Sequence, residues 1–221
     1  MMRKKNEMNI QKPQKIFFET NNLEKINNIE DEIKDDEKIE YKIIECQNVD
    51  NLENYDVEFR VVKFIKCNIL SSKLEKFYFI DVIFDNCNFS NTSFQRSSFS
   101  RCEFINCKLS GTDFTETIQN NVVYKDTNAQ YANFSLSRYN NVLFENTILR
   151  NAYFEEDILK NVFFDKADLM QAQIFKTSLK DIDLSNSFID GITISLEDIK
   201  GAIINEYQAI NLIELIGVKI K

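Results

Sequence analysis

The stretch that decides the fold is residues 79–104, FIDVIFDNCNFSNTSFQRSSFSRCEF, in which phenylalanine returns at every fifth position. The same register runs from Phe59 to Ile194 and includes 28 positions. All but two of these are Phe, Leu, Ile or Tyr, the exceptions being Gln119 and Ala129. An unbroken period of this kind predicts a repeat architecture, because each repeat buries its apolar residues against its neighbours.

A second series of small side chains precedes the first by two residues. Of its 28 members, 24 are Ala, Cys, Ser, Thr or Val, and the only carboxylate is Asp157. Residues two apart lie on one side of an extended segment, so the small and large residue of each unit are expected to point inward together. A period of five fits neither the helix nor the flat strand. If the chain turns after each unit, four units close a square coil. The cysteines expected to pack inside this coil are Cys67, Cys87, Cys102 and Cys107.

The alternation of small and large residues resembles the pentapeptide-repeat family, whose units carry a small residue, any residue, and then Leu or Phe. The resemblance covers about residues 57–194. It implies an all-β fold, a right-handed quadrilateral β-helix of about seven coils with short N- and C-terminal helices. We therefore expect a charged segment at 1–40, a leading strand and N-terminal cap at 41–56, the solenoid at 57–196 and a C-terminal cap at 197–221.

The composition excludes most catalytic classes. The chain has 221 residues, a net charge of −8, no histidine, four glycines and one proline. Without histidine there is no Ser–His–Asp scheme, and with so few glycines there is no phosphate-binding loop. We therefore expect a non-enzyme without cofactor or metal. The acidic balance disfavours direct nucleic-acid binding. No apolar stretch is long enough for a membrane helix or a secretory signal, so a cytoplasmic location is expected.

The C-terminal tail carries the signals of a capping helix. Asn205 is a good N-cap for a helix over 206–216, and Gly217 is a natural stop. The segment 201–218 is similar to the tail of quinolone-resistance members of the family, for which the resemblance implies a dimer contact. A monomeric end cap remains the alternative. The candidate dimer contact comprises Ile210, Ile213, Leu215, Ile216, Val218 and Ile220.

The N-terminal segment combines a basic and an acidic run. Residues 1–15 are basic and residues 30–40 are acidic, and these runs are either solvated flanks or an arm for an anionic partner. Between them, Leu23, Ile26, Ile29 and Ile33 recur at helical spacing. We expect a short amphipathic helix on the first coil.

Residues twenty apart are expected to stack on one outer face of the solenoid. Val123, Leu143 and Phe163 then form an apolar strip, which a soluble protein seldom leaves bare. The strip is a partner or dimer surface, tolerated exposure, or a surface covered by the N-terminal segment. Carboxylates concentrate on the same face. The candidate partner surface comprises Val123, Leu143, Phe163, Glu103, Glu145, Asp165 and Asp183.

Two functional hypotheses follow. The resemblance to quinolone-resistance proteins implies a rod that imitates DNA and binds DNA gyrase or topoisomerase, conferring antibiotic tolerance. Lys125, Lys160 and Lys166 interrupt the acidic field that such mimicry needs. The alternative is a scaffold or effector that binds an unknown protein through the apolar strip. In the interior, Asp157 has Ser137 and Thr177 one coil to either side as hydrogen-bond partners, which favours a satisfied core position or a bulged coil over a functional site.

Overall fold

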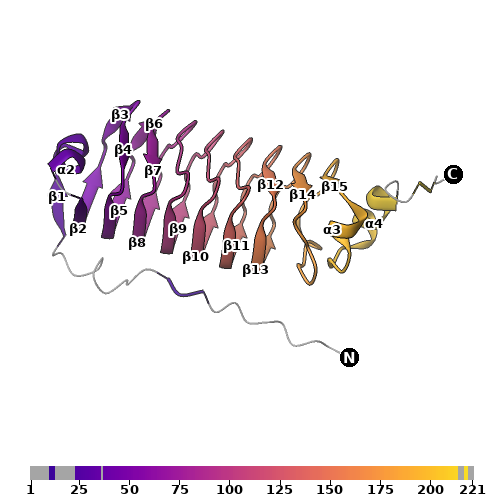
Figure 1. The fold of residues 1–221 in the computed structure, drawn as a ribbon. Coiled ribbons are helices and arrows are strands. Elements are labelled where there is room, and N and C mark those ends of the chain that lie inside the picture. Colours follow the sequence, from indigo (N-terminus) through magenta and orange to yellow (C-terminus); the bar gives the residue numbers. More distant parts are fainter. Residues whose placement is uncertain (1–9, 13–22, 36, 214–216, 219–221) are drawn as a thin grey trace.

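The computed structural model describes residues 10–12, 23–35, 37–213 and 217–218, and it confirms the predicted β-solenoid (Figure 1). An eight-stranded parallel sheet forms one face, and shorter strands and bridges form the others. The strands are β1 Glu24–Ile26, β2 Lys38–Glu45, β3 Asn48–Asp50, β4 Glu53–Tyr55, β5 Glu58–Ile65, β6 Asn68–Leu70, β7 Lys73–Glu75, β8 Tyr78–Asp85, β9 Ser98–Ile105, β10 Ile118–Lys125, β11 Arg138–Glu145, β12 Tyr153–Glu155, β13 Ile158–Asp165, β14 Gln173–Phe175 and β15 Thr193–Ile194. The helices are α2 Ile29–Asp35, α3 Leu196–Ile199 and α4 Glu206–Leu212.

Each turn of the solenoid contains twenty residues. Phe59 pairs with Phe79, Phe79 with Phe99, and Phe99 with Gln119. The chain changes direction because one residue in nearly every five-residue unit between 41 and 191 adopts the left-handed conformation. Among the described residues, 28 that are not glycine have φ between 48° and 65°. Asparagine tolerates this region better than most residues, which explains its frequency at these corners, as in Asn121, Asn141 and Asn161.

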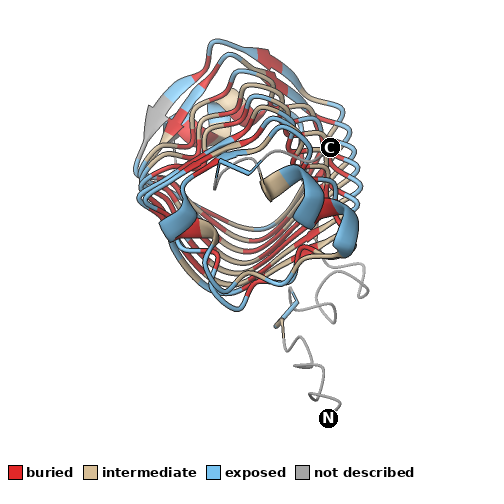
Figure 2. Cartoon of the chain, turned by 90° about the vertical axis from the view of Figure 1, so that its right-hand side faces the viewer, coloured by how far each residue is buried: buried red, intermediate tan, exposed pale blue. Residues whose placement is uncertain are grey.

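The core consists of the two inward series. Seen along the axis, the coils superimpose and the buried positions recur at the same places (Figure 2). All the large residues of the register are buried except Leu159, which is half-buried. Phenylalanine rings stack between turns, with centroids 4.5 Å apart for Phe84 and Phe104. This spacing suits offset stacking, which adds to the gain from burying the ring area.

The solenoid begins one turn earlier than the sequence count of seven coils indicated. Ile39 and Ile44 of β2 pair with Phe59 and Phe64 and are buried. This turn lacks the small-residue series, since Lys42 and Gln47 occupy those positions, and the pattern therefore did not reveal it. The expected N-terminal helix is shorter than predicted. Ile26 belongs to β1, and α2 begins only at Ile29.

Helices cover both open ends of the coil, as a solenoid requires. At the N-terminal end, α2 buries Ile29 and Ile33. At the C-terminal end, Asn205 caps α4 as predicted, in a reciprocal capping box with Gln208. Gln208 is buried and also donates to the carbonyls of Leu184 and Ser187 at 2.8 and 2.7 Å. The described helix runs from Glu206 to Leu212 with Ile213 as its C-cap, and residues 214–216 of the predicted helix lie outside the described residues.

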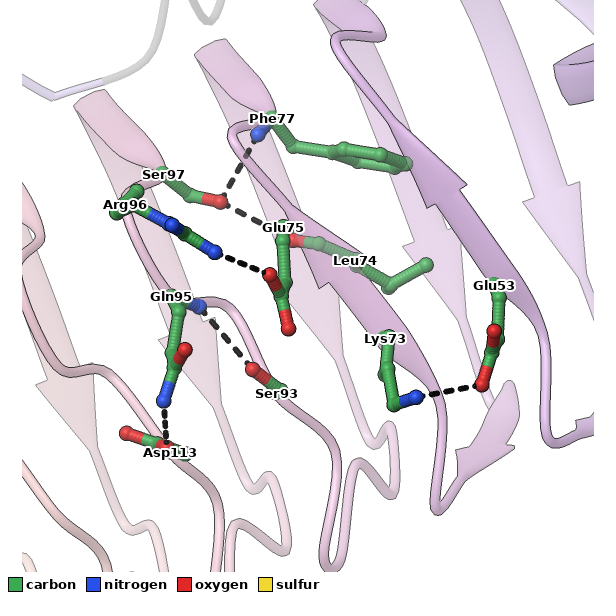
Figure 3. Close-up of polar contacts among 10 residues, drawn as sticks. All are labelled: Glu53, Lys73, Leu74, Glu75, Phe77, Ser93, Gln95, Arg96, Ser97 and Asp113. Carbon is green, nitrogen blue, oxygen red and sulfur yellow. Dashed lines mark hydrogen bonds and ion pairs between the residues drawn. The ribbon is translucent and has the colours of Figure 1, made fainter.

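Side chains add bonds between successive turns (Figure 3). The backbone N–H of Phe77 donates to Ser97 Oγ at 2.9 Å, and this hydroxyl donates to the carbonyl of Leu74 at 3.0 Å. On the outside, Arg96 pairs with Glu75 at 2.6 Å. The inward hydroxyl thus satisfies a corner amide of the preceding turn, which explains why Ser and Thr are frequent at the small positions.

Candidate protein-binding face

The predicted column of outward residues lies on the eight-stranded sheet. Glu103 of β9 pairs in register with Val123 of β10, which pairs with Leu143 of β11 and then with Phe163 of β13. Glu145 and Asp165 form the next column, in register with each other. The sheet thus brings these six residues together. We call Val123, Leu143 and Phe163 the apolar strip.

The apolar strip is not bare along its whole length. Val123 and Glu103 are only 5% and 6% exposed although both point outward, whereas Leu143 and Phe163 are half-buried. Residues 10–12 lie against this face, below the strands in Figure 1. Ile10 and Lys12 line a groove of about 320 Å³ with Val123 and Leu143. The N-terminal segment therefore covers the apolar strip at its Val123 end, which was one of the three alternatives.

Two of the four carboxylates of the candidate partner surface, Glu103 and Glu145, each form an ion pair with a lysine. Glu103 lies 3.4 Å from Lys12, and Glu145 lies 2.6 Å from Lys125. Asp183 lies beyond β13 and accepts hydrogen bonds from the backbone and hydroxyl of Ser185 in its own turn. The ion pairs at Glu103 and Glu145 therefore interrupt the regular unpaired negative charge that a phosphate backbone presents.

A ladder of asparagines borders the apolar strip. Asn161 donates to Asn141 at 2.9 Å, and Asn141 donates to Asn121 at 3.2 Å. The free lone pair at the end of this ladder accepts the backbone N–H of Gln11 at 3.2 Å. The ladder thus ties turns together and also fixes the position of the N-terminal segment.

The left-handed corner positions that carry the asparagine ladder also carry a buried ion pair. Its two residues, Asp81 and Arg101, lie two turns and one turn before Asn121. Arg101 donates twice to Asp81, from Nε to Oδ1 and from an Nη to Oδ2, each at 2.7 Å. The side chain of Asp81 is 2% exposed. The bidentate geometry matches the guanidinium fork to the carboxylate. The two residues are twenty apart, so the stacking of successive turns makes them neighbours, although neither was among the predicted site residues.

The two polar irregularities of the interior, Gln119 and Asp157, belong to one buried hydrogen-bond network. Tyr124 donates to Gln119, which donates to Thr117 Oγ1 at 3.2 Å. Thr117 contacts Ser137 Oγ at 3.1 Å. The backbone N–H of Ser137 donates to Asp157 Oδ1 at 2.8 Å. Gln119 therefore fills a core position with its polar atoms satisfied.

Asp157 occupies the place that Ser137 and Thr177 hold one turn to either side. Its own backbone N–H donates to Thr177 Oγ1 at 3.0 Å. Oδ2 is buried and has no hydrogen-bond partner among the described residues. Burial raises the pKa of this carboxyl to about 8, although the bond from Ser137 lowers it and Glu155 raises it. The carboxyl is thus largely protonated at neutral pH.

Four of the five cysteines are core residues, as predicted, and all five are free thiols. Burial raises the pKa of Cys102 to about 12, and the pKa of Cys87 rises to about 12 through the neighbouring Cys107 thiol and burial. Cys46 alone is exposed. Because the thiolate is the reactive form, the buried thiols are unreactive.

We expect native protein to react with one equivalent of a thiol reagent such as dithionitrobenzoate, and denatured protein with five. The single native equivalent should disappear in Cys46→Ser, which is the control. Two or more fast-reacting thiols in the native chain would contradict the described packing.

The candidate dimer contact is only partly described. Ile210 and Val218 are 53% and 45% exposed, and Ile213 is half-buried. Leu215, Ile216 and Ile220 lie outside the described residues. The described part of the C-terminal end therefore presents an apolar surface that a second chain can cover.

The described residues contain no group of three or more Cys, Asp or Glu arranged to hold a metal ion. No helix among them is long and apolar enough to cross a membrane.

The described geometry defines a class of protein, a parallel β-solenoid of five-residue units with one partly covered outer face. Residues 97–174 match the family model described as "Pentapeptide repeat region". The same register continues on both sides of this match, so the neighbouring coils have the same architecture as the matched region. The match does not include the tail at 201–218.

Several solved structures are similar to the chain at low sequence identity. A trypsin-treated variant of QnrB1, a plasmid-mediated fluoroquinolone resistance protein, is 18% identical with a TM-score of 0.40, covering 81% of this chain and 100% of that one. A second trypsin-treated QnrB1 variant is 22% identical with a TM-score of 0.41, covering 83% and 90%. HetL, involved in heterocyst differentiation regulation in the cyanobacterium Nostoc sp. strain PCC 7120, is 10% identical with a TM-score of 0.33, covering 76% and 90%. No curated protein matches the chain.

Proposed function

We propose that the chain is a non-catalytic binding protein that takes a protein partner through the outer face of β9, β10, β11 and β13. The observation that carries the proposal is the apolar strip. Three large apolar side chains stand in register on adjacent strands, where an isolated surface carries polar residues on its solvent face. A partner that covers Leu143 and Phe163 removes this area from water.

Partner capture with a charged strip tests this function. Leu143→Glu places a carboxylate in the middle of the strip, and we expect the complex to lose at least tenfold in affinity because the charge is desolvated at the contact. Ile158→Glu is the matched control, because Ile158 is 58% exposed on β13 but is not part of the strip. Equal capture by both variants would move the binding surface elsewhere.

A second candidate function is a DNA-mimic binder of DNA gyrase or topoisomerase, linked to antibiotic tolerance. The rod shape and the net charge of −8 favour it, and the ion pairs of Glu103 and Glu145 oppose it on the strip face. A supercoiling assay with a quinolone tests it. Added protein is expected to inhibit gyrase or protect it from the drug, and a reaction unchanged in both respects would remove this candidate.

We further propose a homodimer joined at the C-terminal end. The supporting observation is the exposed apolar pair Ile210 and Val218. Light scattering is expected to give twice the monomer mass for the native chain and the monomer mass for Ile210→Glu. Ile158→Glu serves again as the control and should stay dimeric. A native monomer would reject the dimer.

A further inference from the structure

We infer that the Val123 end of the apolar strip is a docking site for an extended peptide in which an aliphatic residue is followed two positions later by a basic one, and that residues 10–12 of this chain lie against it as an internal substitute. The inference rests on the proposed function, since it defines the partner chemistry of the same face.

Three contacts of different kinds hold the segment. Ile10 lines the groove together with Val123 and Leu143. The backbone N–H of Gln11 donates to Asn121 Oδ1 at 3.2 Å. Lys12 lies 3.4 Å from Glu103. An apolar side chain in the groove wall, a main-chain hydrogen bond and an ion pair within three consecutive residues together recognise an extended peptide, because alternate side chains of such a peptide point to the same side.

The acidic side of the groove explains the preference for a basic residue. Glu103 is outward-facing and its side chain is 8% exposed, while that of Lys12 is 57% exposed. A buried carboxylate needs a charged or hydrogen-bonding partner, and Lys12 is the cation that pairs directly with Glu103. Lys125 pairs with the neighbouring Glu145 and interacts with Glu103 only at longer range, so a basic residue in the incoming peptide is favoured at the position of Lys12.

The occupied groove leaves part of the strip available. Phe163 is half-buried and does not line the groove that contains Ile10. A partner segment can therefore first contact Phe163 and Leu143 and then displace residues 10–12 towards Val123. Because the internal segment is tethered, its effective concentration is in the millimolar range or above. A partner therefore binds more weakly to the covered groove than to an uncovered one.

A single fluorescent reporter tests both the seating and the exchange of the segment. The chain contains no tryptophan, so Ile10→Trp in the full-length protein introduces the only indole. We expect blue-shifted emission and poor quenching by acrylamide. Adding Leu143→Glu should shift the emission to that of the urea-unfolded chain, whereas adding Ile158→Glu should leave it blue-shifted. An indole that is quenched as freely in folded as in unfolded protein would overturn the seating.

Exchange is tested with the same variant and a synthetic peptide of residues 6–14, NEMNIQKPQ. Millimolar peptide is expected to displace the internal segment and shift the emission to the red. The control peptide carries glutamate in place of the lysine that corresponds to Lys12, and it should have at least tenfold less effect. No shift with the native peptide, or equal shifts with both peptides, would overturn the assigned chemistry.

The tryptophan experiment and the partner-capture experiment can fail independently, so a failure of this inference is distinguishable from a failure of the proposed function. If the indole is shielded and released by Leu143→Glu, but partner capture is insensitive to that substitution, the groove is an internal contact only and the proposed function fails. If capture is lost in Leu143→Glu while the indole is freely quenched, the function stands and the internal substitute is wrong.

Discussion

Asp157→Thr is expected to stabilise the chain at pH 8 and to remove most of the loss of stability between pH 4 and pH 8. Threonine fits this position because Thr177 and Ser137, one turn to either side, make the bonds that the site requires. Ser137 Oγ donates to the carbonyl of Phe114, and Thr177 Oγ1 accepts the N–H of Asp157. A hydroxyl at position 157 can accept from Ser137 in the same way, without a buried charge.

The sign of the pH dependence follows from the raised pKa. Burial moves the pKa of Asp157 from the usual 3.8 to about 8 in the folded chain. Between these values the folded state retains a proton that the unfolded state releases, so stability falls as the pH rises and levels off above about 8. Each pH unit contributes about 1.4 kcal/mol, so the native chain loses on the order of 5 kcal/mol across the interval.

Urea unfolding at pH 5 and at pH 8 measures this effect. The native chain is expected to be much less stable at pH 8, and Asp157→Thr should show a smaller difference. Asp50→Thr is the control, because Asp50 is exposed on β3, and its pH dependence should match that of the native chain. Parallel pH dependences for native protein and Asp157→Thr would show that Asp157 is not the group responsible.

Arg101→Met is expected to destabilise the chain by about 3–5 kcal/mol, because it leaves the buried carboxylate of Asp81 without its partner. The loss should be visible as a lower urea midpoint at pH 7. The double variant Asp81→Val with Arg101→Met should recover most of it. Valine suits position 81, since Val61 occupies the equivalent corner one turn earlier with φ 53° and is buried.

An exposed pair provides the matched control for Arg101. Lys176→Met breaks the ion pair with Glu156. The side chains of Lys176 and Glu156 are 68% and 47% exposed, and surface ion pairs contribute about 1 kcal/mol or less to stability. The midpoint should therefore barely move. If Lys176→Met and Arg101→Met had equal effects, burial would not be what makes the Asp81 pair important.

The solenoid could be predicted from the sequence because its register is strict. The five-residue register from Phe59 to Ile194 determines which residues point inward. The twenty-residue length of each turn determines which residues are neighbours on the outside. The first turn was missed because Lys42 and Gln47 stand where small residues were expected, although Ile39 and Ile44 continue the large series. The first turn buries its large residues as the later turns do, but with only one of the two residue series present it is harder to recognise in the sequence.

The candidate face could be predicted only in part. The column from Glu103 to Phe163 followed from the register, and the structure confirms its alignment. The contact of Ile10 and Lys12 with that column did not follow, because the segment lies outside the repeat and no periodicity relates it to Val123. The network from Gln119 to Asp157 could not be predicted, since a five-residue pattern does not encode hydrogen-bond geometry between inward side chains.

Photochemical cross-linking at position 163 tests the central claim that the strip face binds a protein partner. The photoreactive amino acid benzoylphenylalanine replaces Phe163 in one full-length variant and Ile158 in the other, and both are irradiated in cells that express the chain. The account predicts a discrete adduct with one protein from position 163, a stronger adduct when Ile10→Glu is added, and none from position 158. Absence of an adduct from position 163, or the same adduct from both positions, would contradict it.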